Sequence, residues 1–362
     1  MRSLHRPFSP VTRPTPRRRA AILIFALLAT AACAQERPAI VEQPVEVQSI
    51  RLELPEGVHS LDGSSLRWLA GFDLEGSHER FGGFSGLLID GADLLAISDR
   101  GWWWRGRLRL DGSGVLLGAE GDAMWPILDL DGGAVVGRDR HDAEELARFA
   151  SDLIVTFEGE HRLHAYTADD SHGAPRPSAE LPRLLVGPPM EGIDDNGGLE
   201  AVTTLEDGRL LALTEDGRDD AGQIRAFIGS SEPDGLVWTE ITVEATEDFK
   251  PTAAATLPGG DVLLVERSFH PLRGVRIRLS RIRLADLEKK ADELIVTEQL
   301  GRLVPPVPVD NIEAVDVAEH GGRTLIYLLA DDNFRSLQDT LLIQLELVEA
   351  SVAAESARQP SG

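Results

Sequence analysis

The chain has a single cysteine, little positive charge and few segments with helical periodicity. Cys33 lies near the start of the 362 residues, so a disulfide within the rest of the chain is excluded and the fold must be held by its own core. The formal net charge is -24, which argues against nucleic acid as a partner. Such acidity is typical of a solvated exported protein or of one that collects cations.

Several motifs of known catalytic and metal sites are also missing. There is no H-E-x-x-H sequence, and the acidic segment 194–198 lacks the downstream spacing of an EF-hand loop. His161 and His164 would face opposite sides of a strand, which does not favour a shared zinc ion. Residues 83–86 differ from G-x-S-x-G because the second glycine comes one residue early. We therefore interpret Ser85 as part of a tight strand start rather than as a nucleophile.

Residues 1–33 resemble an export signal. A basic stretch ends at Arg19, an apolar run covers residues 20–28, and small residues follow as far as Ala34. The apolar run is too short to span a membrane. Two interpretations of Cys33 stay open, a lipidated cysteine of a bacterial lipoprotein and the middle residue of an A-x-A cleavage site. Both predict an exported protein, either periplasmic or lipid-anchored to the cell envelope through Cys33.

The rest of the chain predicts one domain between two irregular segments. Residues 34–48 are rich in Pro, Glu, Gln and Val and are predicted to be a flexible tether, whereas residues 350–362 are predicted to be a disordered tail. Between them, residues 49–349 consist of short apolar runs bounded by Gly, Asp, Asn or Pro, which is typical of strands. The best helix candidate, Ala285 to Glu293, is short. We therefore expect an all-β fold.

A repeated pattern defines the expected architecture. Five times, a short strand ends on an acidic residue at a similar distance from a preceding Gly, Glu, Asn or Pro cluster. The repeats begin about fifty to sixty residues apart, a period typical of stacked or radially arranged units. They cover residues 82–99, 142–158, 196–215, 251–266 and 310–331.

The third repeat shows what one unit contains. It divides into four strands, at residues 199–204, 210–214, 223–228 and 237–244. Four antiparallel strands in each repeat predict a β-propeller with five blades. A sixth blade stays possible if one is hidden between Trp102 and His141. The last repeat lacks a fourth strand, and Leu66 to Leu74 can supply it, so that an N-terminal strand closes the propeller.

Two positions in each repeat are expected to meet at one end of the propeller. One residue begins a strand and the other ends the strand that returns, and in an antiparallel hairpin these positions lie at the same end. The first set is Ser85, Glu144, Glu200, Thr252 and Glu313; the second is Asp99, Glu158, Glu215, Glu266 and Asp331. If these are the inner strands, about eight carboxylates surround one mouth of the channel. Such a ring requires a bound cation, raised pKa values or pairing with basic residues.

The residue types in this ring favour a calcium site. Oxygen ligands select hard cations, and Ca²⁺ tolerates an irregular ring better than Mg²⁺ does. We predict Glu200 and Glu313 as ligands or general base, and Arg162, Lys250 and Arg267 as groups that hold an anionic ester. The predicted metal ligands are Asp99, Glu144, Glu158, Asn196, Glu215, Glu266, Asn311 and Asp331. The alternative for each acid is a hydrogen bond to the following turn.

The tryptophans 102–104 allow two interpretations as well. They can form a stacking platform at the mouth, or they can pack between blades, which is the commoner arrangement.

The same segments resemble a known family, the phytase-like proteins described by an esterase-like activity of phytase. The resemblance lies in residues 84–87, 98–101, 142–144, 157–162, 196–201, 264–267, 311–314 and 330–334, together with Gln338. The sequence departs from the family pattern at Leu146 and at Ala201 and Ala314, where glycine is common. The resemblance implies an exported propeller and a hydrolase acting on phosphate or carboxylate esters.

Three functions remain open at this point. The preferred hypothesis is a calcium-dependent hydrolase acting on a small ester or phosphoester at the channel mouth. The second is a non-catalytic propeller that binds a partner protein or an envelope glycan. The third is a lactonase-like calcium propeller. Fold alone does not separate them.

Overall fold

The structure, a computed structural model, describes residues 41–56, 61, 65–136, 142–169, 176–233, 235–288 and 293–348. All of these lie in one compact unit, Arg37–Gly362. The predicted export signal, the first part of the predicted tether and the predicted tail lie outside the described residues. Among the described residues, no helix has the length and apolar character that a membrane span requires.

The strands form five sheets, which we number as blades 1 to 5 in chain order. Blade 1 contains β4 (Phe84–Asp90), β5 (Asp93–Ser98), β6 (Trp102–Leu110), β7 (Leu116–Pro126) and β1 (Gln43–Pro44). Blade 2 contains β8 (Ala143–Phe149), β9 (Asp152–Phe157), β10 (Arg162–Asp169), β11 (Arg176–Pro177) and β12 (Arg183–Leu185). Blade 3 contains β13 (Leu199–Thr204), β14 (Leu210–Arg218), β15 (Ile224–Glu232), β16 (Gly235–Val243) and β20 (Leu294–Ile295).

Blades 4 and 5 complete the set. Blade 4 contains β17 (Lys250–Thr256), β18 (Val262–His270), β19 (Gly274–Ile282) and β21 (Glu298–Leu303). Blade 5 contains β22 (Asn311–His320), β23 (Arg323–Asp331), β24 (Leu341–Leu347), β3 (Leu66–Gly76) and β2 (Val47–Arg51). Neighbouring strands pair antiparallel, apart from the short parallel pair of β16 with β20.

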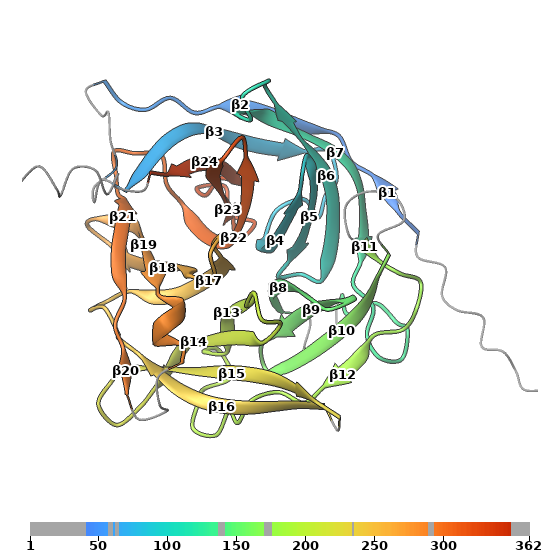
Figure 1. The fold of residues 1–362 in the computed structure, drawn as a ribbon. Coiled ribbons are helices and arrows are strands. Elements are labelled where there is room, and N and C mark those ends of the chain that lie inside the picture. Colours follow the sequence, from blue (N-terminus) through green and yellow to red (C-terminus); the bar gives the residue numbers. More distant parts are fainter. Residues whose placement is uncertain are drawn as a thin grey trace, which may run out of the picture. The chain divides into compact units, whose positions relative to one another are not determined.

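The blades are arranged in a ring. The first strands of the five blades, β4, β8, β13, β17 and β22, each contact the first strands of the two adjacent blades, and β22 returns to β4. They surround the centre of the unit, with the later strands of each blade outside them (Figure 1). The predicted five-bladed β-propeller is therefore confirmed. The region after Trp102 supplies β6 and β7, which are the outer strands of blade 1.

An N-terminal strand closes the ring, as predicted. β3 pairs with β24 from Leu66↔Leu347 to Asp73↔Leu341 and so becomes the fourth strand of blade 5. The predicted tether differs from the structure, because β2 pairs with β3 and Gln43–Pro44 pairs with β7. Val45 explains the difference, since its side chain is 3% exposed and packs in the core between blades 1 and 5. Any tether ends before these strands.

The predicted helix is also shorter than expected. Within the described part of 285–293, the only helical segment is the 3₁₀ turn Leu284–Asp286. Its N-cap, Arg283, makes no side-chain capping hydrogen bond. A segment without a cap and with one buried anchor, Leu287, does not extend into an α-helix.

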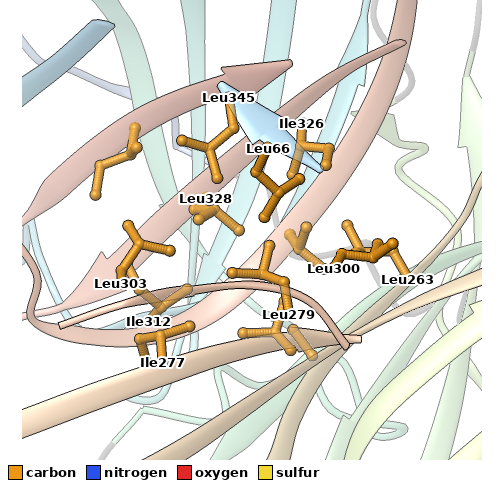
Figure 2. Packing of buried hydrophobic residues seen from close by; sticks show 14 of the residues in the cluster. Leu66, Leu263, Ile277, Leu279, Leu300, Leu303, Ile312, Ile326, Leu328 and Leu345 are labelled. Carbon is orange, nitrogen blue, oxygen red and sulfur yellow. The ribbon is translucent and has the colours of Figure 1, made fainter. Parts of the chain in front are cut away.

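Apolar side chains pack mainly between adjacent blades. Between blades 4 and 5, Leu263 and Leu279 face Ile326 and Leu328, and Leu66 of the closing strand joins them (Figure 2). Each fully buried side chain of this kind stabilises the fold by about 1.5–3 kcal/mol. Successive side chains of a strand point to opposite faces of its blade. Both faces carry apolar side chains because each face packs against a neighbouring blade.

The tryptophans of β6 follow the same pattern. Trp103 packs between blades 1 and 2, and Trp104 packs between blades 1 and 5; they are 1% and 0% exposed. Trp102, 9% exposed, joins the second of these clusters. The structure therefore favours the packing interpretation over a stacking platform.

Candidate functional site

A β-bulge interrupts the inner strand of every blade near its start. The pairing register breaks at Ser85 in blade 1, at Glu144 and Glu145 in blade 2, and at the equivalent residues of the other three blades, Glu200, Thr252 and Glu313. A bulge leaves one residue outside the ladder and re-aims its side chain. Apart from Glu145, these are the first-set residues of the sequence analysis, so the repeated motif encodes a bulge near the start of each inner strand.

In two of the five bulges a hydroxyl group joins neighbouring blades. The Ser85 hydroxyl donates to the Ala143 carbonyl oxygen at 2.5 Å, and the Thr252 hydroxyl donates to the Ile312 carbonyl oxygen at 2.9 Å. Both side chains are 1% exposed. Ser85 therefore has a structural contact, in agreement with its interpretation as a tight strand start.

The other bulge residues bring three carboxyls together. Burial raises the pKa of Glu144, Glu200 and Glu313 well above the usual value, and neighbouring acids raise it further. The Glu200 carboxyl is affected by both Glu144 and Glu313, so acids from three different blades lie within electrostatic reach of one another. Like charges this close favour either shared protons or a bound cation.

Acids of the second set join the same cluster. Burial, followed by repulsion from Asp331 and Asp142, raises the pKa of Asp99 to about 8. Burial likewise raises the pKa of Asp331 to about 6. The pKa of Glu158 is also raised by burial, although a hydrogen bond to Glu200 opposes the shift. We use "acidic cluster" below for Asp99, Asp142, Glu144, Glu158, Glu200, Glu215, Glu313 and Asp331.

One part of the acidic cluster has the spacing of a metal site. Carboxylate oxygens of Asp142, Glu144 and Glu158 all lie within 4.8 Å of one another. Glu158 is oriented by the Gly198 N–H group, which donates to its Oε1 at 3.4 Å. Three converging carboxylates suit a hard divalent cation. Asp142 was not among the predicted ligands, although its place two residues before Glu144 in the repeat could have identified it.

On blade 5, an asparagine holds two acids of the acidic cluster. The Asn311 amide donates to Glu313 Oε1 at 2.7 Å and to Asp331 Oδ2 at 3.2 Å. The Asn333 backbone N–H donates to Asp331 Oδ1 at 2.6 Å. Asn311 is 3% exposed and its own amide oxygen has no hydrogen-bond partner. Asn311, a predicted metal ligand, thus lies beside two acids of the acidic cluster, and its amide positions their carboxyls.

Blade 4 contributes cations where the other blades contribute acids. Lys250 Nζ lies 2.6 Å from Asp216 and 3.7 Å from Glu215. Arg267 Nη2 lies 3.3 Å from Glu215 Oε1 and 3.7 Å from Glu313 Oε1, so it links acids of blades 3 and 5. Both side chains remain partly exposed. The channel mouth thus has an acidic side, formed by the acidic cluster, and a basic side, formed by Lys250 and Arg267.

Arg162 contributes a further cation near blade 2. Its guanidinium lies over the Phe157 ring, 4.3 Å from the ring centroid, at the end of the blade where Glu158 lies.

Two predicted ligands lie apart from the cluster. Glu266 is fully buried and accepts hydrogen bonds from Arg278 and from the Ser280 hydroxyl, within blade 4. β18 pairs with β19 without a break, so Glu266 keeps the alternation of the strand and does not turn into the channel. Asn196 is exposed in the loop before β13. Neither residue belongs to the site that the structure brings together.

Sequence reasoning missed Glu145, the second bulge residue of blade 2. The Leu146 backbone N–H donates to its Oε1 at 2.9 Å, and the backbone N–H groups of Val202 and Ala254, on two further inner strands, act to lower its pKa. Glu145 is 1% exposed, and burial raises its pKa well above the usual value. Its carboxyl is therefore buried among the inner strands of blades 2, 3 and 4. The Glu-Glu doublet in the repeat was the available signal.

His161 is a second residue at this end of blade 2 that was not among the predicted site residues. It has a left-handed backbone with φ of 44°, and both ring nitrogens lack a hydrogen-bond partner. A Cβ at residue 198 would lie 2.7 Å from His161 Nδ1, so a larger residue there would displace the His161 ring. Strained, unsatisfied residues of this kind concentrate at functional sites. His164, by contrast, is buried against Phe157.

Comparisons with known proteins extend these observations. A sequence model described as "Phytase-like: Esterase-like activity of phytase" matches residues 79–334. No curated protein matches the sequence. Among solved structures, Myxococcus xanthus glutaminyl cyclase is similar over 78% of this chain and 97% of its own, with 13% identity and a TM-score of 0.41.

Two further structures are similar to a comparable degree. The PQQ-bound aldose sugar dehydrogenase of Streptomyces coelicolor covers 79% of this chain and 99% of its own, with 14% identity and a TM-score of 0.43. A Xanthomonas campestris gluconolactonase covers 85% and 88%, with 14% identity and a TM-score of 0.37. Likenesses this distant carry no argument about the chemistry of this chain.

Proposed function

The chain belongs to the phytase-like family described by the esterase-like activity of phytase, and from this membership we propose that it is a calcium-dependent hydrolase of phosphate or carboxylate esters. The observation that carries the proposal is the group Asp142, Glu144 and Glu158, whose oxygens lie within 4.8 Å of one another at the channel mouth. The substrate would be a small molecule, since the group lies inside a ring of strands.

The residues present fit a calcium ion. All three side chains offer oxygen, and irregular oxygen ligation favours Ca²⁺ over Mg²⁺. We assign Asp142, Glu144 and Glu158 as ligands, with Asp99 as a further acid beside them. A bound Ca²⁺ would polarise the ester oxygen and lower the pKa of a water molecule.

Glu200 is the proposed general base. It shares a hydrogen bond with Glu158, and burial together with the neighbouring acids raises its pKa well above the usual value, which strengthens it as a base. Glu313 is held by Asn311 and by Arg267, which suits a positioning or ligand role better. In the proposed reaction Glu200 takes the proton of the attacking water and returns it to the leaving group.

The basic side of the site would hold the anionic part of the substrate. Lys250 and Arg267 are partly exposed and both lie beside the Glu215 carboxylate. A phosphate or carboxylate group of the substrate can replace Glu215 as their ion-pair partner. Arg162 would act from the blade 2 side. An acidic protein requires such local positive charge to bind an anionic ester.

Hydrolysis assays test the proposal. The purified protein is given an aryl phosphate and an aryl acetate, with calcium and then with a chelator. Turnover that the chelator abolishes and calcium restores supports a metal-dependent esterase, and the better substrate gives the ester class. Absence of turnover on both esters contradicts the proposal and favours a propeller that binds a protein or glycan through the same mouth.

We also propose that the protein is exported, as residues 1–33 indicate. Fractionation of expressing cells, with mass spectrometry of the mature N-terminus, distinguishes a lipid-anchored Cys33 from a soluble periplasmic product. A cytoplasmic protein with an uncleaved N-terminus would contradict export.

A further inference from the structure

Blade 4 carries a row of basic side chains at its mouth end, one from each strand. They are Lys250 on β17, Arg267 on β18, Arg276 on β19 and Arg302 on β21. The register puts all four at one end of the blade, because Lys250 pairs with Arg267, Arg276 with Ser268, and Arg302 with Arg278. Arg267 itself pairs with Ile277, so Lys250 and Arg267 face one side of the blade, whereas Arg276 and Arg302 face the other. The row runs from the channel to the outer edge of the blade. A group of four basic side chains is unusual in a protein with a net charge of -24.

The two outer members of the row lie against one aromatic ring. The guanidinium carbon of Arg276 is 5.3 Å from the centroid of the Phe249 ring, and that of Arg302 is 5.5 Å from the same centroid. Phe249 is 3% exposed, so its position is fixed by the core. Both guanidiniums therefore share one ring, and the register places them on the same face of adjacent strands, since Arg302 pairs with Arg278, two residues after Arg276.

Neither outer arginine has a carboxylate partner. Arg276 donates from Nη2 to the Ser268 hydroxyl at 2.8 Å, and Arg302 donates from Nε to Gln299 Oε1 at 2.8 Å. Within the described part of the chain, no acidic group lies in ion-pair contact with either guanidinium. The inner members differ, because Lys250 and Arg267 are both paired with Glu215.

Nearby acids do not neutralise the pair. Glu247 and Asp248 directly precede Phe249, but both are exposed and neither forms an ion pair with Arg276 or Arg302 among the residues that the structure describes. The buried Glu266 on the same face is paired with Arg278. Two adjacent guanidiniums without a counter-ion repel each other, and an anion bound between them removes that repulsion.

We propose that Arg276 and Arg302 form a binding site for a phosphate group, distinct from the acidic cluster at the channel mouth. Both side chains are only partly buried, so a ligand can reach them. Each guanidinium keeps N–H groups beyond the one it donates to Ser268 or Gln299, and a planar fork matches the oxygens of phosphate. The phosphate can be free or carried on a larger molecule. The site does not depend on the proposed hydrolase activity.

Calorimetric titration with two probes tests the site and its ligand. Inorganic phosphate and glycerol phosphate are added to the purified protein in the presence of a chelator, so that a metal at the channel mouth cannot hold them. We expect saturable binding that weakens as salt concentration rises. The double variant Arg276→Gln with Arg302→Gln should weaken it roughly tenfold or more. The tighter probe indicates whether the natural ligand is free or esterified phosphate.

Two controls make the result specific. Arg283→Gln removes an exposed arginine of the same blade that is paired with Glu298, and it should leave the affinity unchanged. Lys250→Gln removes a cation that the proposed hydrolase uses at the channel mouth, so it shows whether any of the bound phosphate lies there, and the binding due to Arg276 and Arg302 should persist in it. The double variant Arg276→Lys with Arg302→Lys keeps both positive charges but lacks the planar guanidinium groups. It replaces the double glutamine variant in the titration if that variant fails to fold. We expect it to bind more weakly than the native protein.

Absence of saturable binding to the native protein overturns the proposal. So does binding that both arginine double variants retain in full, or binding that only Lys250→Gln abolishes, since the ligand would then lie at the channel mouth.

Discussion

A single residue position, the bulge of each inner strand, decides what each blade contributes at the channel mouth. Where the position holds Glu, as in Glu144, Glu200 and Glu313, a carboxyl joins the acidic cluster. Where it holds Ser or Thr, the hydroxyl bonds to the next blade instead. The residue types at these five bulges, which share one backbone geometry, therefore determine which chemical groups lie at the channel mouth.

Glu200→Gln tests the proposed general base. The amide keeps the size of the side chain but cannot take a proton, so we expect turnover of the better aryl ester to fall by about a hundredfold or more. The thermal unfolding curve and calcium affinity should change little. Glu232→Gln, at the exposed end of β15, is the matched control and should keep full activity. Unchanged turnover in Glu200→Gln would remove this residue from the mechanism.

Asp316→Asn tests a pH-dependent contribution to stability. The Asp316 carboxyl accepts hydrogen bonds from the Ile89 and Val317 N–H groups, and burial raises its pKa from 3.8 to about 7. The folded state thus binds a proton that the unfolded state releases, so the stabilisation is complete below about pH 4 and is lost as pH rises to about 7. Asparagine removes this titration. Urea unfolding from pH 4 to 8 should show a shallower fall for the variant, and an unchanged slope would contradict the assignment.

At the scale of the element, strand pairing decides which acids reach the mouth. Asp99 and Glu158 lie just beyond the last residues of β5 and β9, where the ladder has ended. Asp331 lies beyond the last residue of β23 that pairs with β24. Glu266 instead lies inside a continuous pairing of β18 with β19 and forms an ion pair with Arg278.

Glu266→Gln separates a structural role from a ligand role. The change leaves the buried Arg278 guanidinium without its counter-charge, so we expect the free energy of unfolding to fall by about 3 kcal/mol. Calcium affinity should remain unchanged. Glu298→Gln breaks the exposed pair with Arg283 and should cost no more than about 1 kcal/mol. Urea unfolding and calcium titration measure both effects, and a loss of calcium affinity in Glu266→Gln would return this residue to the site.

At the scale of the whole molecule, ring closure and the acidic cluster depend on each other. β3 pairs with β24 and completes blade 5, and the Gly83 N–H group of blade 1 donates to Asp332 of blade 5 at 3.0 Å. The closed ring forces carboxyls from four blades into one small volume. Protonation relieves their repulsion in the absence of metal, and a bound cation would relieve it at higher pH.

Calcium should therefore stabilise the protein more strongly as pH rises. Ligands must lose their protons before they bind a cation, and burial raises the pKa values of the proposed ligands Glu144 and Glu158 and of the neighbouring Asp99, the last to about 8. We expect calcium to raise the melting temperature little at pH 5 and by several degrees at pH 8, and a chelator to reverse the increase. Magnesium at the same concentration is the control. A shift that is equal at both pH values would contradict ligation by these acids.

Much of this protein could be predicted from its sequence. Strand period, turn residues and the recurring acids are local features, so the five repeats, the closing strand Leu66 to Leu74 and the position of Glu144, Glu200 and Glu313 followed from them. The family resemblance came from the same segments.

Only the tertiary structure decided which side chains meet. A shift of one residue in strand register turns a side chain to the opposite face, and the bulges make such shifts. Glu266 lies in an unbroken pairing of β18 with β19 and so forms its ion pair inside blade 4, whereas Glu145 is left outside the pairing of β8 with β9 by a bulge. The pairing of Arg276 and Arg302 on Phe249 likewise depends on contacts between residues far apart in the chain. Local sequence determines where the strands begin and end, whereas the packing of blades around a closed ring determines the neighbours of each charge.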